Sequence, residues 1–188
     1  MSCIIGVIHQ DKVYAGADSL AAQNEDGSKG ITKDEKLFIK NGLLIGSVGV
    51  PRVQQIIKYN MTFPKYEKGV DPFKYIVNKF VVKLQECLRK HGSVSNGSDI
   101  QNFGETVIMV GIKIPEPRLF IVCSNFQVEE ECNPYMAIGS GEKYALGSLH
   151  ATGRIVKHWG PTQRIGLALE AAEKFNNTVG KPFIFKIL

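Results

Sequence analysis

The stretch Met1-Ser2-Cys3-Ile4-Ile5-Gly6-Val7 decides the fold, because it begins a β-branched run directly behind the first residues of the chain. β-Branched residues favour strands, and terminal residues usually fray unless something holds them. We therefore expect this strand to be built into a sheet. If Met1 is removed, Ser2 carries a hydroxyl and a free α-amine, which is the N-terminal form of a nucleophile with its own base. A protein that simply starts with Met-Ser and a strand is the alternative, and these residues alone leave it open.

Length and composition predict one soluble domain over residues 1–188. The hydrophobic fraction is 44% and the charged fraction 22%, both ordinary for a globular protein. Apolar runs stay well short of the roughly 20 residues of a membrane span. A charged region does not precede the first apolar run, so we expect no secretory signal and a cytoplasmic location.

The cysteines and basic residues exclude several other classes. The four cysteines, Cys3, Cys87, Cys123 and Cys132, lack metal-ligand or CxxC spacing and are interpreted as free thiols. We predict no metal and no cofactor. The net charge of +5 is modest, and basic residues alternate with acids, as in Lys33-Asp34-Glu35-Lys36. This pattern is typical of a solvated surface, so neither nucleic acid nor a membrane is an expected partner.

Strand signals come in hairpins. Asn41-Gly42 between two apolar runs is the strongest short hairpin signal. Turn residues at 24–30 and 93–103 predict loops. The predicted strands are 4–8, 13–17 (with 20–23 as an extension), 36–40, 43–49, 105–112, 118–123, a short one at 126–128, 135–138 and 183–185.

Helix signals come in consecutive pairs. The first pair begins at Pro51, ending before Phe63, and at Asp71-Pro72, ending at His91-Gly92. The second pair begins after Gly141 and at Pro161, the latter extending to Asn177. Because strands pair in hairpins and do not alternate with helices, the pattern is not that of a parallel sheet. It predicts an α+β fold, a four-layer αββα sandwich of two antiparallel sheets flanked by helix pairs.

Four motifs then occur in order along the chain. They are the potential N-terminal Ser2, the turn Ala17-Asp18-Ser19, Lys36 at the start of a strand that leads to Gly46-Ser47-Val48-Gly49, and Ile138-Gly139-Ser140-Gly141 followed by Tyr144-Ala145. This ordered set resembles the proteasome β-subunit and HslV family of N-terminal-nucleophile hydrolases, and also a group of small proteasome-like proteins of bacteria and phages. The resemblance spans most of the chain. Each motif is weak alone, and their order and spacing carry the specificity.

The resemblance implies a role for each matched residue. Ser2 matches the nucleophile, with its α-amine as general base. Lys36 matches the lysine that lowers the pKa of that amine, and Asp18 the residue that orients the lysine. Gly49 matches the oxyanion donor, and Ser140 a serine that hydrogen-bonds near the terminal amine. Without the resemblance, these residues are interpreted as an edge-strand lysine, two turn residues and a helix cap.

Further parts of the chain match or depart from the family pattern. Ala21 and Ala22 match the segment that pairs with an extended substrate. The usual Thr nucleophile is replaced by Ser2, which lacks the methyl group that restricts χ1. A supporting aspartate falls near Asn176-Asn177 in this sequence. Cys3 is a second candidate nucleophile, but its side chain is expected on the opposite face of the strand, in the core.

The sequence thus predicts an N-terminal-nucleophile amide hydrolase, a proteasome-like peptidase that acts on a peptide or protein. The resemblance implies a homo-oligomeric ring or spiral and allows an ATP-dependent unfoldase partner. A non-catalytic scaffold or binding subunit with an unprocessed N-terminus is the alternative. An amidase for a small molecule is a third interpretation, because a fold does not fix a substrate.

Overall fold

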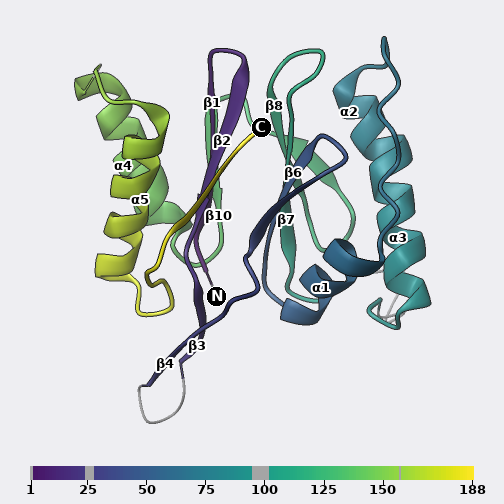
Figure 1. Cartoon of the computed structure of the whole chain (residues 1–188), viewed down its shortest axis with the longest axis horizontal. Helices are drawn as coiled ribbons and strands as arrows, with labels where there is room; N and C mark the ends of the chain where they lie inside the picture. The colour runs from purple at the N-terminus through teal and green to yellow at the C-terminus, as the bar shows by residue number, and fades with distance from the viewer. Residues whose placement is uncertain (1, 24–27, 95–101, 157) are drawn as a thin grey trace.

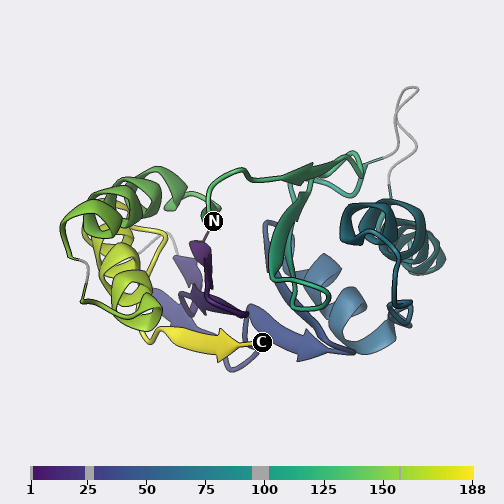
Figure 2. The ribbon, with the colours of Figure 1, turned by 90° about the horizontal axis from the view of Figure 1, so that it is seen from above.

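The protein is a sandwich of four layers, helices–sheet–sheet–helices (Figures 1 and 2). The computed structural model describes residues 2–23, 28–94, 102–156 and 158–188. Helices α4 (Glu142–Ile155) and α5 (Pro161–Phe175) form one outer layer. The helical segments between residues 51 and 90 form the other. This architecture confirms the predicted α+β, αββα fold.

The first sheet has the order β10-β1-β2-β11 and is antiparallel throughout. Its strands are β1 (Ile4–His9), β2 (Lys12–Ala17), β10 (Tyr135–Ile138) and β11 (Ile184–Ile187). The N-terminal strand β1 is therefore interior, with β10 on one side and β2 on the other. This placement confirms that the start of the chain is built into a sheet.

The second sheet has the order β5-β6-β7-β8-β9. Its strands are β5 (Leu37–Lys40), β6 (Leu43–Val48), β7 (Val107–Ile112), β8 (Arg118–Val122) and β9 (Val128–Glu130). Asn41 and Gly42 join β5 to β6 with φ values of +49° and +75°. Positive φ at both central residues is typical of a type I′ turn, so the hairpin forms as predicted.

The helices beside the second sheet are α1 (Pro51–Asn60) and one longer helical run. That run consists of α2 (Pro72–Tyr75), the π-helical segment η1 (Ile76–Phe80) and α3 (Val81–Lys90). The Asp71 carboxylate accepts a hydrogen bond of 3.0 Å from the Lys74 amide and caps the run. The cap and Pro72 explain why the predicted start of the helix is correct.

Three apolar layers hold the sandwich together. Side chains such as Ile4, Leu44 and Met109 pack between the two sheets. A second cluster, which includes Cys3 and Leu169, lies between the first sheet and helices α4 and α5. The largest cluster fills the space between the second sheet and helices α1 to α3. Burial of apolar surface on both faces of each sheet is the main force that fixes the layers.

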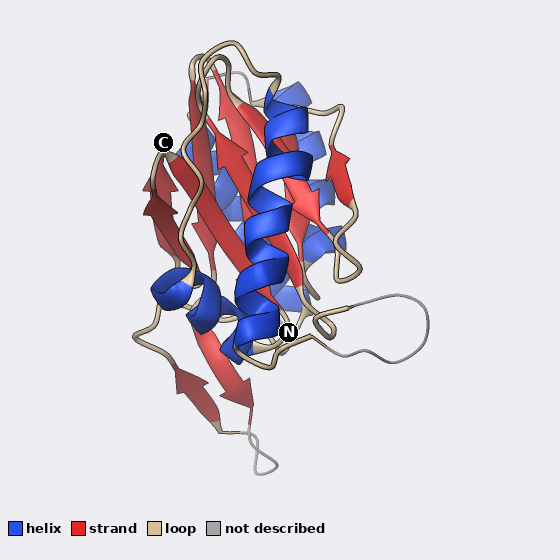
Figure 3. Cartoon of the chain, turned by 90° about the vertical axis from the view of Figure 1, so that its right-hand side faces the viewer, coloured by secondary structure: helices blue, strands red, loops and turns tan. Residues whose placement is uncertain are grey.

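Two predicted segments need correction. Strand β4 (Lys29–Ile31) begins inside the predicted loop 24–30 and pairs with β3 (Leu20–Gln23) in a hairpin that projects from the sandwich (Figures 1 and 3). Pairing with β3 decides this strand, because Lys29-Gly30-Ile31 is too short to show an alternating strand pattern and contains a glycine. The short strand predicted at 126–128 forms at β9 instead, since Phe126 adopts a φ of +69° in the preceding turn. Residues 24–27 and 95–101 of the predicted loops lie outside the described residues.

One further difference concerns the end of a helix. Helix α5 ends at Phe175, two residues before the predicted end at Asn177. Within the described ranges, none of the helices is both long and apolar enough to cross a lipid bilayer.

Candidate active site

Ser2 is held at a fixed position at the start of β1. It is 4% exposed, and its main-chain oxygen accepts a hydrogen bond of 3.2 Å from the Gly141 amide. Its nitrogen donates to Ser140 Oγ at 3.1 Å. Cys3, the next residue, donates its amide to Asp18 Oδ1 at 2.9 Å. These bonds tie the residues before β1 to two other parts of the chain, at Asp18 after β2 and at Ser140 after β10.

Asp18 and Lys36 form a buried ion pair beside this strand. Lys36 Nζ lies 2.9 Å from Asp18 Oδ1 and 2.7 Å from the main-chain oxygen of Leu20. The Asp18 carboxylate is 1% exposed and also accepts from the Leu20 amide at 3.1 Å. A buried charge is tolerated where it is paired and hydrogen-bonded. The sequence-predicted pair is thus brought together.

Burial shifts the pKa of Lys36 and the pKa of Cys3, the two titratable groups beside Asp18. It lowers the pKa of the Lys36 ammonium from its ordinary value, and the nearby Asp18 charge acts in the opposite direction. Burial raises the pKa of the Cys3 thiol to about 12, with Asp18 adding to the effect. Cys3 is fully buried among residues of α4 and α5 and stays a neutral thiol near pH 7. The interpretation of Cys3 as a core residue is confirmed.

Two glycines have backbone conformations that a side chain would not tolerate. Gly49 follows β6 with a φ of +113°, and a Cβ there would lie 2.1 Å from the Glu105 main-chain oxygen. Gly139 follows β10 with a φ of +101°, and a Cβ there would lie 2.3 Å from the Ser2 main-chain oxygen. Only glycine fits these positions without displacing the backbone. Gly139 therefore allows the turn at Ser140 to approach Ser2.

A polar network extends from Ser140 to the end of α5. Ser140 Oγ lies 2.7 Å from Thr178 Oγ1, and the Thr178 hydroxyl donates to Asn176 Oδ1 at 2.7 Å. The Asn176 amide nitrogen donates to the Ser140 main-chain oxygen at 2.7 Å. The Asn176 side-chain amide lies where the family pattern has a supporting aspartate. It holds Ser140 through a hydrogen bond and carries no charge. Thr178 was missed from the sequence, although Asn-x-Thr after a helix is typical of a turn that the Asn side chain closes.

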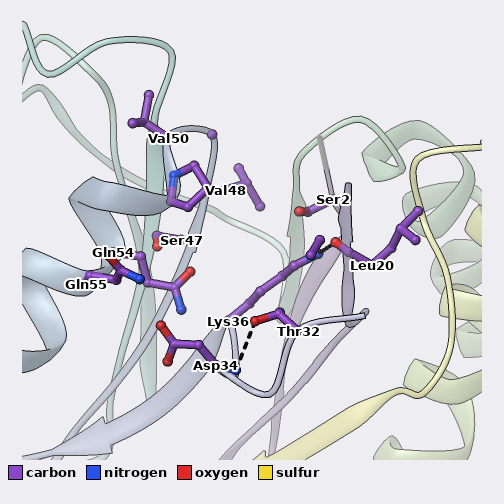
Figure 4. A pocket seen from close by; sticks show the side chains of 13 residues that line it. Ser2, Leu20, Thr32, Asp34, Lys36, Ser47, Val48, Val50, Gln54 and Gln55 are labelled. Carbon is purple, nitrogen blue, oxygen red and sulfur yellow. Dashed lines mark hydrogen bonds between the residues drawn. The ribbon is translucent and has the colours of Figure 1, made fainter. Parts of the chain in front are cut away.

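Ser2, Lys36 and Gly49 line one pocket of about 300 Å³ (Figure 4). Leu20 and Ala21 of β3 border it on one side. Polar residues that the sequence analysis did not single out, namely Thr32, Asp34, Gln54 and Gln55, also line the pocket, together with the apolar residues Val48, Val50 and Pro51. Four of the five candidate site residues are linked by hydrogen bonds through the Ser2–Cys3 main chain, and the fifth, Gly49, lines the same pocket as Ser2 and Lys36.

Solved structures have this fold along nearly the whole chain, although the sequence matches no protein-family model and no curated protein. Thiobacillus denitrificans BPH in complex with epoxomicin has a TM-score of 0.80 at 19% identity, covering 99% of this chain and 97% of that chain. Eukaryotic HslV from Trypanosoma brucei has a TM-score of 0.67 at 15% identity, with 99% and 98% covered. Anbu, an ancestral β-subunit from Yersinia bercovieri, has a TM-score of 0.68 at 19% identity, with 100% and 81% covered. The chain has the fold of the proteasome-like N-terminal-nucleophile hydrolases.

Proposed function

We propose that the protein is an N-terminal-nucleophile amide hydrolase, a proteasome-like peptidase with Ser2 as nucleophile after removal of Met1. The observation that carries the proposal is the buried Lys36–Asp18 pair in contact with the Ser2–Cys3 segment, at a pocket that Ser2 itself lines. The positive charge of the Lys36 ammonium would favour the neutral, basic form of the Ser2 α-amine.

The proposed reaction has two steps. The Ser2 hydroxyl attacks the substrate carbonyl while its own α-amine takes the proton, directly or through a water, and the amine then protonates the leaving amine. Water hydrolyses the resulting ester with the same amine as base. Lys36 keeps the α-amine neutral, and Asp18 orients Lys36. The Gly49 amide stabilises the oxyanion, where one lost donor typically costs about 10²–10³ in rate. Ser140 fixes the terminal nitrogen, which it contacts at 3.1 Å.

We propose that an extended peptide is the substrate and that it adds to the edge of β3. Ala21 lines the pocket, and within the described residues β3 pairs with β4 alone. The proposal includes assembly into a homo-oligomeric ring or spiral in the cytoplasm, with an ATP-dependent unfoldase as the partner class. The mass of the native particle, measured by light scattering, tests the assembly.

The first test of this function is the intact mass of the native protein. We expect it to lack Met1, because the proposed base exists only when the Ser2 nitrogen is a free amine. Epoxomicin, the ligand of the BPH structure, should then add one inhibitor mass to the chain and no mass to a Ser2→Ala variant. A retained Met1 in the assembled protein, with no adduct, would contradict the proposal and favour the scaffold alternative.

The pH dependence of kcat/KM should be bell-shaped. On the acid side, activity rises as the α-amine loses its proton, below the pKa of about 7.7 for a free terminus, because Lys36 repels a second positive charge. On the alkaline side, activity falls as Lys36 becomes neutral, at a pH below its ordinary pKa of 10.5 because burial lowers that pKa. Since Asp18 raises the pKa of Lys36, Asp18→Asn should move the alkaline limb to lower pH. A profile that is flat from pH 6 to 10 would exclude these two groups.

A further inference from the structure

A second pocket, here called the turn pocket, lies where β5 turns into β6. Its volume is about 620 Å³, against about 300 Å³ for the pocket at Ser2, and the two share no lining residue. Asn41 lines the turn pocket, whereas Lys36 and Gly49, at the other ends of the same two strands, line the pocket at Ser2. Leu188 also lines the turn pocket, and in Figure 1 the C-terminus lies toward the opposite end of the sandwich from the N-terminus. A ligand in the turn pocket would therefore leave Ser2 open.

The lining of the turn pocket is mainly apolar. Its two neutral polar side chains are already bonded to main-chain oxygens: the Tyr66 hydroxyl donates to Val70, and the Asn41 amide nitrogen donates to Phe63 at 3.2 Å. Cavities of about 300–1,000 Å³ with mostly apolar walls and a few polar groups are typical of small-molecule sites. The turn pocket thus suits the apolar body of a ligand. Its apolar lining residues are Leu43, Ile112, Ile114, Pro115 and Leu188.

Three cations complete the lining, Lys65, Lys68 and Lys113. Within the described residues, none of these three lysines has a carboxylate at ion-pair distance, since the lysine ion pairs of that part of the chain involve other residues. The lining also includes one carboxylate, at Leu188, and its main-chain oxygen accepts a hydrogen bond of 3.1 Å from the Val13 amide. Three ammonium groups against one carboxylate give the pocket a positive charge.

We infer that the turn pocket binds an amphiphilic anion, an alkyl carboxylate of the fatty-acid class. The alkyl chain fills the apolar cavity, and the carboxylate pairs with the lysines. A peptide fits the lining less well, because buried main-chain amides need hydrogen-bond partners and the neutral polar side chains here are already bonded. This inference goes beyond the proposed function and does not depend on it, because Ser2 lines the other pocket.

Calorimetric titration of the native protein with octanoate, decanoate and dodecanoate tests the inference. Burial of one methylene group is equivalent to about fourfold in affinity, so each step in this series should tighten binding about tenfold. Decanol has an alkyl chain of the same length as decanoate but no charge, and it should bind about tenfold more weakly because it cannot pair with the lysines. Absence of binding, an affinity independent of chain length, or equal binding of decanol and decanoate would overturn the inference.

Glutamine substitutions of the lysines test the role of their charge. The first variant combines Lys65→Gln, Lys68→Gln and Lys113→Gln. It should bind decanoate about tenfold more weakly than the wild type and decanol equally well. The matched control also loses three positive charges, from exposed lysines outside the lining, and should bind both ligands as the wild type does. It combines Lys79→Gln, Lys90→Gln and Lys174→Gln. Equal losses in both variants would mean that only net charge matters, which contradicts a site at the turn pocket.

Ile114→Glu locates the site independently of the lysine variants. Ile114 is 61% exposed and lines the turn pocket, so glutamate there would place a carboxylate among the lysines and compete with the ligand. We expect an affinity for decanoate about tenfold lower. Ile155→Glu is the control, because Ile155 is 79% exposed at the end of α4 and does not line the pocket. Thermal melting checks the fold of both variants, and an unchanged affinity in folded Ile114→Glu would exclude this site.

Two more titrations separate the inference from its neighbours. Ser2→Ala should bind decanoate as tightly as the wild type, so failure of the proposed hydrolase and failure of the turn pocket are observed in different experiments. An acetylated leucine tripeptide with a free carboxylate should bind more weakly than decanoate. If this peptide bound more tightly, and its binding were lost in Ile114→Glu, the ligand would be the C-terminus of a polypeptide and the fatty-acid class would be wrong.

Discussion

Ser2→Ala should lower kcat/KM for a peptide substrate by a factor of about 10⁴ or more, because it removes the only atom that forms the acyl-enzyme. The fold should persist, since the Ser2 main chain keeps its bonds to Ser140 and Gly141. Ser2→Thr should remain active, because it retains the hydroxyl and adds a methyl group that restricts χ1. Initial rates with a fluorogenic peptide, on protein of verified intact mass, measure both effects.

Ser148→Ala, on α4, is the control for this series. It removes one hydroxyl from a helix that borders the first sheet, and Ser148 does not line the pocket. Its activity should equal that of the wild type. Wild-type turnover by Ser2→Ala would mean that another group is the nucleophile and would remove the basis for the proposed mechanism.

Lys36→Met should have the second large effect, on stability as well as activity. Methionine retains the apolar stem but leaves the Asp18 carboxylate, 1% exposed, without its cation. Removing one member of a buried pair typically costs about 3–5 kcal/mol of unfolding free energy. Turnover should fall to the level of Ser2→Ala, because the α-amine loses the charge that lowers its pKa. Urea denaturation at pH 7 measures the first effect.

Two further variants separate charge from packing. Lys36→Met combined with Asp18→Asn removes both charges and should recover more than half of the lost stability, but none of the activity. Lys83→Met breaks an exposed pair with Glu86 at 2.7 Å, and pairs of that kind contribute at most about 1 kcal/mol. If Lys36→Met were as stable as Lys83→Met, the Lys36–Asp18 pair would have no structural role.

Local chemistry explains which parts of the fold could be predicted. The Asn41-Gly42 turn and the Asp71-Pro72 cap depend on neighbouring residues, so the sequence is sufficient to locate them. Strand β4 depends on pairing with β3, and it is too short to show an alternating strand pattern of its own. The π-helical segment at 76–80 could not be predicted either, because apolar residues spaced three and four apart indicate a helix without distinguishing the π form from the α form.

The candidate site shows the same division. Ser2, Asp18, Lys36, Gly49 and Ser140 were named because they resemble an ordered set of motifs. Their catalytic roles remain predictions, while their proximity is a property of the fold. The polar part of the pocket lining around Asp34 could not be predicted, because it depends on how the segment before β5 turns toward α1. That turn is fixed by contacts between distant residues, such as the bond from Gln54 to Glu35.

The interior position of β1 has a consequence for how the site can be lost. Its neighbours β10 and β2 bond to it on both edges, so the strand cannot detach at either edge without opening the sheet. Local opening usually spares such central strands and affects projecting hairpins first, here β3 and β4. The residue proposed to carry the chemistry is thus coupled to the most cooperative part of the molecule, whereas the segment proposed to receive substrate can loosen independently.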